Sequence, residues 1–235
     1  MCGRFAQLHP DVIAMNFRAR ADDWVREAQP AHNVAPSQTA VVVHRDGTHR
    51  VARGLTWGFR DPRLASRLII NVRTETAAAS PLFRHAWQRR RCAVPVELFY
   101  EWGGTVRRPH AVRAADDDWL VLAALFEPEG RFAILTGPST GPLATLHERA
   151  PIFLHPDHLD AWLDPRADPQ GVLQRQGQPP PTHLILSPLS RYLNRRDAQG
   201  PACLAPATDP PNAAGPDADS EAEAPVGATL PLKFG

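Results

Sequence analysis

Four residues that lie far apart in the sequence have the chemistry of a nucleophilic active site: Cys2, Asn71, Glu101 and His147. Removal of Met1, which the small side chain at position 2 permits, would make Cys2 the amino-terminal residue. Its α-amine, with a pKa of about 8, and its thiol, with a pKa of about 8.5, are then both partly nucleophilic at neutral pH. An aldehyde forms an imine with such an amine, and the thiol can close onto the imine to give a thiazolidine ring. Position alone leaves open that this cysteine is incidental.

The other three side chains could move protons or orient a substrate. Glu101 lies in the run Phe-Tyr-Glu-Trp at 99–102, where desolvation by the rings would raise the pKa of its carboxyl and suit it to proton transfer. An exposed glutamate at a strand end is the alternative. Histidine is the usual proton shuttle near neutral pH, but among ten histidines His147 and His155 are rivals on local grounds. Asn71 ends an apolar strand and could form a turn or hydrogen-bond a substrate oxygen.

Two tryptophans and an arginine could contact a nucleic acid. Trp57 and Trp102 could stack on exposed bases, as aromatic residues do in proteins that bind single strands, although core packing is the commoner role of tryptophan. Arg73 alternates with Asn71 along the predicted strand, and it could face a phosphate or pair with Glu75. The local sequence leaves both pairs of alternatives open.

The charge of the chain is divided unevenly between a basic body and an acidic tail. The formal net charge of the 235 residues is +1. Residues 206–235 hold five acidic residues against Lys233, a net charge of −4, which leaves +5 on residues 1–205. A modestly basic body is compatible with nucleic-acid binding, as it is with many enzymes. Because Lys233 is the only lysine, Schiff-base chemistry must use the α-amine, unless the tail reaches the site.

Composition excludes several classes of protein. With 43% hydrophobic residues the chain can build a sizeable core, and no apolar run is long enough for a membrane span. The start lacks the basic-then-apolar pattern of a signal peptide, so we expect a cytoplasmic protein. The three cysteines, Cys2, Cys92 and Cys203, have no close pairing, which argues against a disulfide framework and a cysteine-rich zinc site. We expect no metal or cofactor.

The hydrophobic pattern predicts many short strands with a few helices between them. Asp46-Gly47 separates two apolar runs and is a strong hairpin signal, and Pro95 suggests an edge or a bulge. We expect helices at 10–27, near 74–79, at 81–90 and at 157–163, and strands at 39–44, 48–55, 67–72, 92–99, 112–114, 119–126, 131–135 and 182–186. This pattern indicates a mixed α+β fold around an antiparallel sheet or barrel. Residues 168–181 read as a loop and residues 206–235 as a disordered Pro/Ala-rich tail.

Taken in order, the motifs resemble those of one family, the SRAP proteins, also described as SOS-response-associated peptidases or abasic-site processing proteins. The motifs are Met-Cys-Gly-Arg-Phe at 1–5, Asn-Val-Ala-Pro at 33–36, Trp-Gly-Phe at 57–59, Ile-Asn-Val-Arg-Thr-Glu-Thr at 70–76, Phe-Tyr-Glu-Trp at 99–102 and His-Glu-Arg-Ala-Pro at 147–151. A closing region at 194–204 is also similar. The resemblance covers residues 2 to about 205.

The resemblance implies a single α+β domain over residues 2–205, with a mainly antiparallel β-barrel-like core, peripheral helices and a positively charged groove for single-stranded DNA. It implies that Cys2 forms a thiazolidine with the ring-opened sugar aldehyde of an abasic site. Asn71 would position the sugar or the amino terminus, and Glu101 would act as the acid and base. The resemblance selects His147 over His155 for Schiff-base chemistry and crosslink reversal. It also implies a peptidase-like self-processing that frees Cys2.

The same resemblance implies a set of DNA contacts, to which Trp57 is added for base stacking. The set is Arg4, Asn33, Pro36, Trp57, Arg73, Trp102 and Arg149. The chain departs from the family pattern after Trp57-Gly58, where Phe-Arg-Asp-Pro-Arg at 59–63 lacks a second tryptophan. The chain therefore lacks a second ring for base stacking or strand separation at this place. Arg84 is a candidate substitute for another basic contact.

We therefore expect a monomer that processes abasic sites in single-stranded DNA, cytoplasmic and associated with the nucleoid when it acts on DNA, with the partner of the tail left open. Two alternatives remain. An amino-terminal-nucleophile peptidase acting on protein would use Cys2 and Glu101 without a DNA groove. A non-catalytic single-strand binder would use Trp57, Trp102 and the arginines, and would keep its activity after Cys2→Ala.

Overall fold

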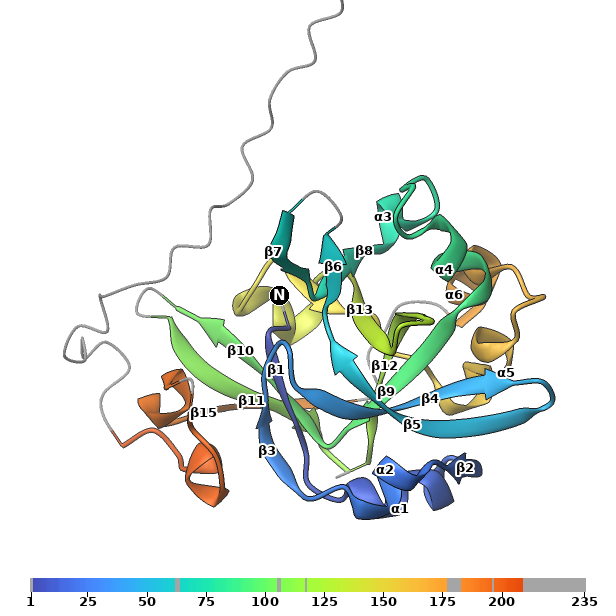
Figure 1. Cartoon of the computed structure of the whole chain (residues 1–235). Helices are drawn as coiled ribbons and strands as arrows, with labels where there is room; N and C mark the ends of the chain where they lie inside the picture. The colour runs from blue at the N-terminus through green and yellow to red at the C-terminus, as the bar shows by residue number, and fades with distance from the viewer. Residues whose placement is uncertain are drawn as a thin grey trace, which may run out of the picture.

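Two sheets and a two-stranded hairpin organise the computed structural model, which describes residues 2–61, 64–104, 107–116, 118–176, 183–195 and 197–208 (Figure 1). The predicted tail lies outside the described residues from 209 onward. Ala207 still donates its backbone N–H to Pro188 O at 3.1 Å, so the described fold continues past the predicted boundary at 205. The fold is mixed α+β in a single domain, with most of its regular structure in strands, as the sequence predicted.

The larger sheet contains a closed ring of paired strands. Its order is β14 (Arg149–Pro151), β13 (Arg131–Pro138), β12 (Leu120–Glu127), β9 (Arg91–Val96), β4 (Thr39–Asp46), β5 (His49–Trp57) and β2 (Ala19–Ala21). Strand β13 also pairs in parallel with β5, at Arg131↔Thr56 and Phe132↔Trp57, so the pairings from β13 through β12, β9, β4 and β5 return to β13. Strand β8 (Asn71–Arg73) pairs in parallel with β13 beyond this ring closure.

The smaller sheet places the start of the chain among interior strands. Its order is β15 (Leu184–Pro188), β11 (Arg108–Ala114), β10 (Leu98–Gly103), β1 (Arg4–Gln7) and β3 (Ala31–Val34). All of its pairings are antiparallel, and Arg4 lies opposite Tyr100. Strands β6 (Phe59–Asp61) and β7 (Leu64–Ile69) form the separate hairpin. Residues next to Cys2 are therefore fixed beside the strand that carries Glu101.

Short helices cover the outside of the strands, and in Figure 1 α1 and α2 lie below β4 and β5 while α4, α5 and α6 lie together at the right. The α-helices are α1 (Pro10–Asn16), α2 (Asp23–Glu27), α3 (Thr74–Ala77), α4 (Arg84–Arg89), α5 (Leu159–Leu163) and α6 (Pro169–Gln176). In the part of the chain that the structure describes, 3₁₀ turns span Gly141–Thr145, Pro156–His158, Arg191–Asn194 and Pro201–Leu204. Within the described residues, no helix combines the length and the apolar character needed to cross a membrane.

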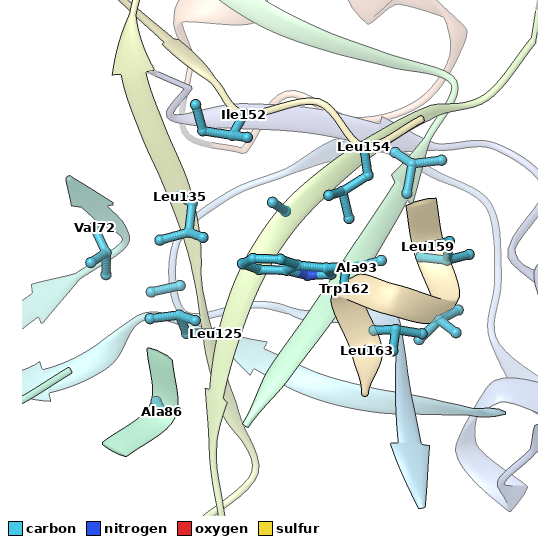
Figure 2. Packing of buried hydrophobic residues seen from close by; sticks show 14 of the residues in the cluster. Val72, Ala86, Ala93, Leu125, Leu135, Ile152, Leu154, Leu159, Trp162 and Leu163 are labelled. Atoms are coloured by element: carbon cyan, nitrogen blue, oxygen red, sulfur yellow. The ribbon is translucent and has the colours of Figure 1, made fainter. Parts of the chain in front are cut away.

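Strand β4 separates two hydrophobic cores, because successive side chains of a strand point to opposite faces. Val41 and Val43 belong to the core around Trp162, part of which Figure 2 shows, whereas Ala40 and Val42 belong to the core around Trp57. Burial on both faces explains the continuous apolar run in this strand. The Trp162 ring is fully buried, and its Nε1–H donates to Cys92 O at 2.9 Å.

Two buried polar side chains hold the sheets where backbone pairing is missing. The pairing of β9 with β4 covers only Cys92 and Ala93. Beyond it the amide of Gln7 donates to Val41 O and Pro95 O at 2.8 Å each, and its oxygen accepts from Val41 N at 2.9 Å. Pro95 therefore lies where β9 has left β4, in agreement with its predicted edge position.

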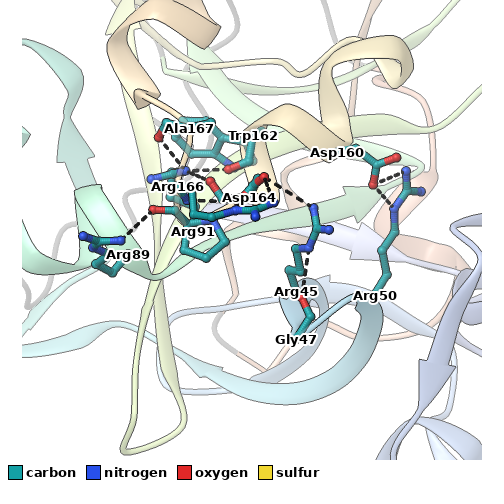
Figure 3. A network of polar contacts seen from close by, with 11 residues as sticks. Arg45, Gly47, Arg50, Arg89, Arg91, Asp160, Trp162, Asp164, Arg166 and Ala167 are labelled. Atoms are coloured by element: carbon teal, nitrogen blue, oxygen red, sulfur yellow. Dashed lines mark hydrogen bonds and ion pairs between the residues drawn. The ribbon is translucent and has the colours of Figure 1, made fainter.

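Arg91 joins β9 to the helices at the other end of the strand (Figure 3). Its guanidinium is buried and donates only to backbone carbonyls, those of Trp87, Gln88, Trp162, Asp164 and Ala167. Burial lowers the pKa of Arg91 to about 10, and the carboxylates of Asp164 and Asp168 oppose that effect. The guanidinium thus closes the ends of α4 and α5 against the ring of strands.

Several predicted elements are confirmed and others are wrong. The hairpin at Asp46-Gly47 is confirmed, with Gly47 in the left-handed region at φ 56°. The strands predicted at 119–126 and 131–135 are confirmed as the antiparallel pair β12 and β13. The helix predicted over 10–27 is wrong, because the chain turns at Arg18, with φ 50°, and forms β2 between α1 and α2. The loop predicted at 168–181 instead contains α6, and its residues 177–181 lie outside the described residues.

Candidate functional site

The Cys2 backbone is held by Asn71, at the point where the chain leaves the β6–β7 hairpin for β13. Asn71 Nδ2 donates to Cys2 O at 2.9 Å. Asn71, in β8, pairs with Ile134 of β13, whereas Ile69 still pairs with Phe59 in the hairpin. This change of partner strand allows Asn71 to reach Cys2. The strand predicted at 67–72 is therefore broken at Ile70, and the break turns the amide toward the start of the chain.

Next to this contact lies a cavity of about 490 Å³ whose lining brings together distant parts of the sequence. Three of the four predicted catalytic residues, Asn71, Glu101 and His147, line it. Cys2 lies behind the wall, with no exposed surface. The lining residues are Gly3, Arg4, Arg67, Leu68, Ile69, Ile70, Asn71, Glu101, Trp102, Arg107 and His147.

Glu101 lies in β10 with 5% of its surface exposed, as expected from its aromatic neighbours. One carboxylate oxygen accepts from the backbone N–H of Trp102 at 3.1 Å. Burial raises the pKa of the Cys2 thiol well above its ordinary value, and the nearby Glu101 carboxylate raises it further. The Cys2 thiol, which donates weakly to Arg4 O at 3.8 Å, is therefore protonated at neutral pH.

The ring of His147 is oriented by the backbone that follows it. The N–H of Arg149 donates to His147 Nδ1 at 3.0 Å, so a neutral ring carries its proton on Nε2. His147 comes after the 3₁₀ turn at 141–145, and the preceding Leu146 packs beside the end of β10, where a Cβ on Gly103 would lie 2.5 Å from Leu146 Cδ2. His155 does not line this cavity, and it pairs with Asp157 on an exposed turn.

Comparison with known proteins identifies the family. The model of the family described as SOS response associated peptidase (SRAP) matches residues 1–196. The chain belongs to this family. The abasic site processing protein YoqW of Bacillus subtilis is 29% identical over 198 residues, which cover 76% of this chain and 87% of YoqW. The abasic site processing protein YedK of Escherichia coli is 27% identical over 222 residues, which cover 88% of this chain and all of YedK.

Solved structures share the fold of this SRAP protein. A crystal structure of a phage-related protein from Bordetella bronchiseptica is 25% identical with a TM-score of 0.65, and the match covers 80% of this chain and 94% of that one. A crystal structure from Bacteroides thetaiotaomicron matches with a TM-score of 0.74 at 16% identity, over 88% of this chain and all of that one. At that identity the second match shows the fold alone.

Arg149 of this SRAP protein is bound to an acid rather than free at the surface. Its guanidinium donates to both carboxylate oxygens of Glu75, at 2.8 and 2.9 Å, and to Thr136 O at 2.7 Å. The Arg149 guanidinium lowers the pKa of Glu75 from 4.5 to about 2. Of the two alternatives for Arg73, pairing with Glu75 is therefore wrong, and the side chain of Arg73 is exposed.

Arg4 is positioned by Asn33 and by the closing region of the chain. Arg4 Nη1 donates to Asn33 Oδ1 at 3.0 Å, and Asn33 Nδ2 donates to Ala198 O at 2.8 Å. Trp102, which lines the cavity, donates its ring N–H to Asn194 Oδ1 at 2.8 Å. Asn33 has no exposed surface and both ends of its amide are used within the protein, and its contact with DNA stays a prediction.

The ring of Trp57 is also fully buried, between Phe5 and Phe132 in the core, and base stacking by Trp57 stays a prediction. Its ring N–H donates to Ile70 O at 3.0 Å, so Trp57 supports the break that aims Asn71 at Cys2. Pro36 is partly buried and precedes Ser37, which has φ 73°. The cavity lining does not include Pro36 or Arg84.

Three residues at the cavity were missed by the sequence reasoning. Arg67 and Arg107 line it, and Gly103 allows the segment before His147 to approach β10. The signal for Gly103 was its place directly after the Phe-Tyr-Glu-Trp run; the two arginines had no local signal among 25 arginines. Among the described residues, no group of three or more His, Cys, Asp or Glu side chains could hold a metal ion.

Proposed function

We propose that this protein processes abasic sites in DNA, and that it captures them in single-stranded DNA by covalent reaction with Cys2. The observation that carries the proposal is the hydrogen bond from Asn71 to Cys2 O at the wall of a cavity lined by Glu101 and His147. Membership of the SRAP family and relatives named abasic site processing proteins support the same substrate. The body without lysine makes the α-amine of Cys2 its available imine former.

The reaction begins with the amine rather than with the sulfur. After Met1 is removed, the Cys2 amine attacks the aldehyde carbon of the ring-opened sugar, and loss of one water gives an imine. The thiol sulfur then adds to the imine carbon, and the thiol proton finishes on the nitrogen of the thiazolidine. The buried thiol is protonated at neutral pH, so it needs a proton acceptor at this second step.

Glu101 and His147 supply the proton transfers in this scheme. The Glu101 carboxylate, close enough to influence the thiol, accepts the thiol proton and returns it to nitrogen. His147 presents Nε2–H, the tautomer that its bond from Arg149 N selects, to the oxygen that leaves as water. Ring closure competes with strand cleavage through the imine, so a lyase-like side reaction accompanies slow closure. Peptidase-like self-processing would free the amine by removing Met1.

The test is a denaturing gel of protein incubated with a single-stranded oligonucleotide that carries one abasic site. The purified chain should lack Met1 by intact mass, and it should form an adduct that survives denaturation. Cys2→Ala should give no stable adduct, although borohydride should still trap its imine because an α-amine remains. Lys233→Arg is the matched control, since it removes the only lysine and should leave the adduct unchanged.

Two results would count against the proposal. A chain that has lost Met1 and gives no adduct with abasic DNA refutes covalent capture, and it favours an amino-terminal-nucleophile peptidase instead. An adduct that persists in Cys2→Ala and disappears in Lys233→Arg places the chemistry on the tail.

A further inference from the structure

The mouth of the cavity carries two arginines to which the proposed reaction gives no role. Arg67 comes from β7 of the separate hairpin, and Arg107 comes from the turn between β10 and β11. Both side chains belong to exposed residues. Within the described part of the chain, neither guanidinium forms an ion pair or a side-chain hydrogen bond. Arg149, by contrast, is bound to Glu75.

The charge at the cavity favours an anion. Among the described residues, its lining contains Arg4, Arg67 and Arg107 against one carboxylate, that of Glu101. Arg4 is engaged with Asn33, which leaves the two exposed guanidinium groups to meet a ligand. A guanidinium presents a planar fork of donors that matches the oxygens of a phosphate.

We propose that Arg67 and Arg107 form a clamp that binds the phosphodiester groups flanking the abasic sugar. The inference rests on the proposed function, because it takes abasic single-stranded DNA as the ligand of this cavity. Arg67 belongs to the hairpin that lacks the second tryptophan, so in this proposal the hairpin contributes a phosphate contact rather than a ring that stacks on bases. Phosphate contacts fix the register of the strand, and they carry no information on sequence.

The backbone at Arg107 gives an independent argument. Arg107 has φ 45°, in the left-handed region where a residue with a Cβ is strained by about 1 kcal/mol and glycine is not. Gly104, three residues earlier in the same turn, has φ 76°. A large charged side chain held at a position that favours glycine, at the edge of a cavity, is the kind of strain that collects at binding sites.

Salt dependence of binding tests the clamp without relying on the covalent step. In a Cys2→Ala background, binding of a fluorescent single-stranded oligonucleotide in which one tetrahydrofuran, which has no aldehyde, replaces the abasic sugar would be measured over a range of NaCl concentrations. Each phosphate contact contributes roughly 0.7 to the slope of log K against log salt on a single strand. Adding Arg67→Gln and Arg107→Gln together should lower the slope by about 1.4. Arg175→Gln, an exposed arginine on α6, is the matched control and should not change it.

A second variant separates binding from folding. Arg107→Gly relieves the left-handed strain, so its melting temperature should be equal or higher while its salt slope falls by about 0.7. Arg67→Lys keeps the charge and should keep the slope. A slope unchanged in the double variant, or binding that does not depend on salt, overturns the clamp. Failure of the proposed function is distinct, because it is the absence of adduct from the chain with Cys2 intact.

Discussion

Replacing Gly103 by alanine asks whether close contact between β10 and the segment before His147 sets the reaction rate. A Cβ on Gly103 would lie 2.5 Å from Leu146 Cδ2 and 3.0 Å from Leu146 Cα. The side-chain atom can rotate away, but the Cα belongs to the backbone that continues into His147. Ordinary van der Waals contact begins at 3.4 Å, so this backbone must move by about 0.4 Å.

A shift of 1 Å at a reacting group costs roughly 100-fold in rate, so a shift of about 0.4 Å corresponds to a loss of roughly sixfold. On the proposed function, Gly103→Ala should slow adduct formation by about this factor. The measurement is a single-turnover time course with saturating abasic single-stranded DNA, quantified on denaturing gels. Saturation removes any difference in DNA affinity from the comparison.

Two controls assign the loss to His147. In a His147→Ala background, the Gly103 substitution should have little further effect on the rate, as a double-mutant cycle requires for coupled residues. Gly104→Ala adds a Cβ with no atom within 4 Å, so it should lower stability through its φ of 76° and leave the rate unchanged. A wild-type rate for Gly103→Ala, or the same loss in the absence of His147, would show that this contact does not act through His147.

Two further predictions concern stability. Gln7→Met keeps the side-chain length but leaves buried backbone groups of two strands without a hydrogen-bond partner. The free energy of unfolding, measured in urea, should therefore fall by about 3 kcal/mol or more, and a fall of less than about 1 kcal/mol would contradict the bridging role. Arg149 lowers the pKa of Glu75 to about 2, so their ion pair stabilises the protein above pH 4.5 and this stabilisation is lost as the pH falls toward 2. The melting temperature of Glu75→Gln, measured against pH, should lack this part of the acid dependence. Identical pH profiles for the variant and the wild type would show that the ion pair contributes nothing.

The local sequence predicted those parts of the fold that short-range signals determine. Asp46-Gly47 predicted the hairpin because only a few residue types adopt a left-handed turn without strain. The helix predicted over 10–27 was wrong because β2 forms by parallel pairing with β5, a contact with residues about 30 positions away. Strands β1 and β3 were missed for the same reason: each has four residues and depends on its partners.

The order of the motifs carried information on the candidate site that single residues did not, and it selected three residues that the fold brings to one cavity. His147 and His155 were rivals on local grounds, and only the packing after β13 brings one of them to the cavity. The burial of Trp57 and Asn33 could not be predicted, because a strand residue's exposure depends on what covers it. Arg67 and Arg107 come together through two hairpins that are remote from each other in the sequence.

The burial of Cys2 sets a time limit on its maturation. Asn71, which binds its carbonyl, is synthesised 69 residues later, and Glu101 follows after another 30. At roughly 5–20 residues per second, about 5–20 s pass between the synthesis of Cys2 and that of Glu101. During this interval the partners that bury Cys2 do not yet exist, and an aminopeptidase on the ribosome can reach Met1. Once β1 docks between β10 and β3, Cys2 is covered. On the proposed function, we therefore expect a separate enzyme to remove Met1 most readily during translation, and slow processing would leave a folded population with a blocked amine.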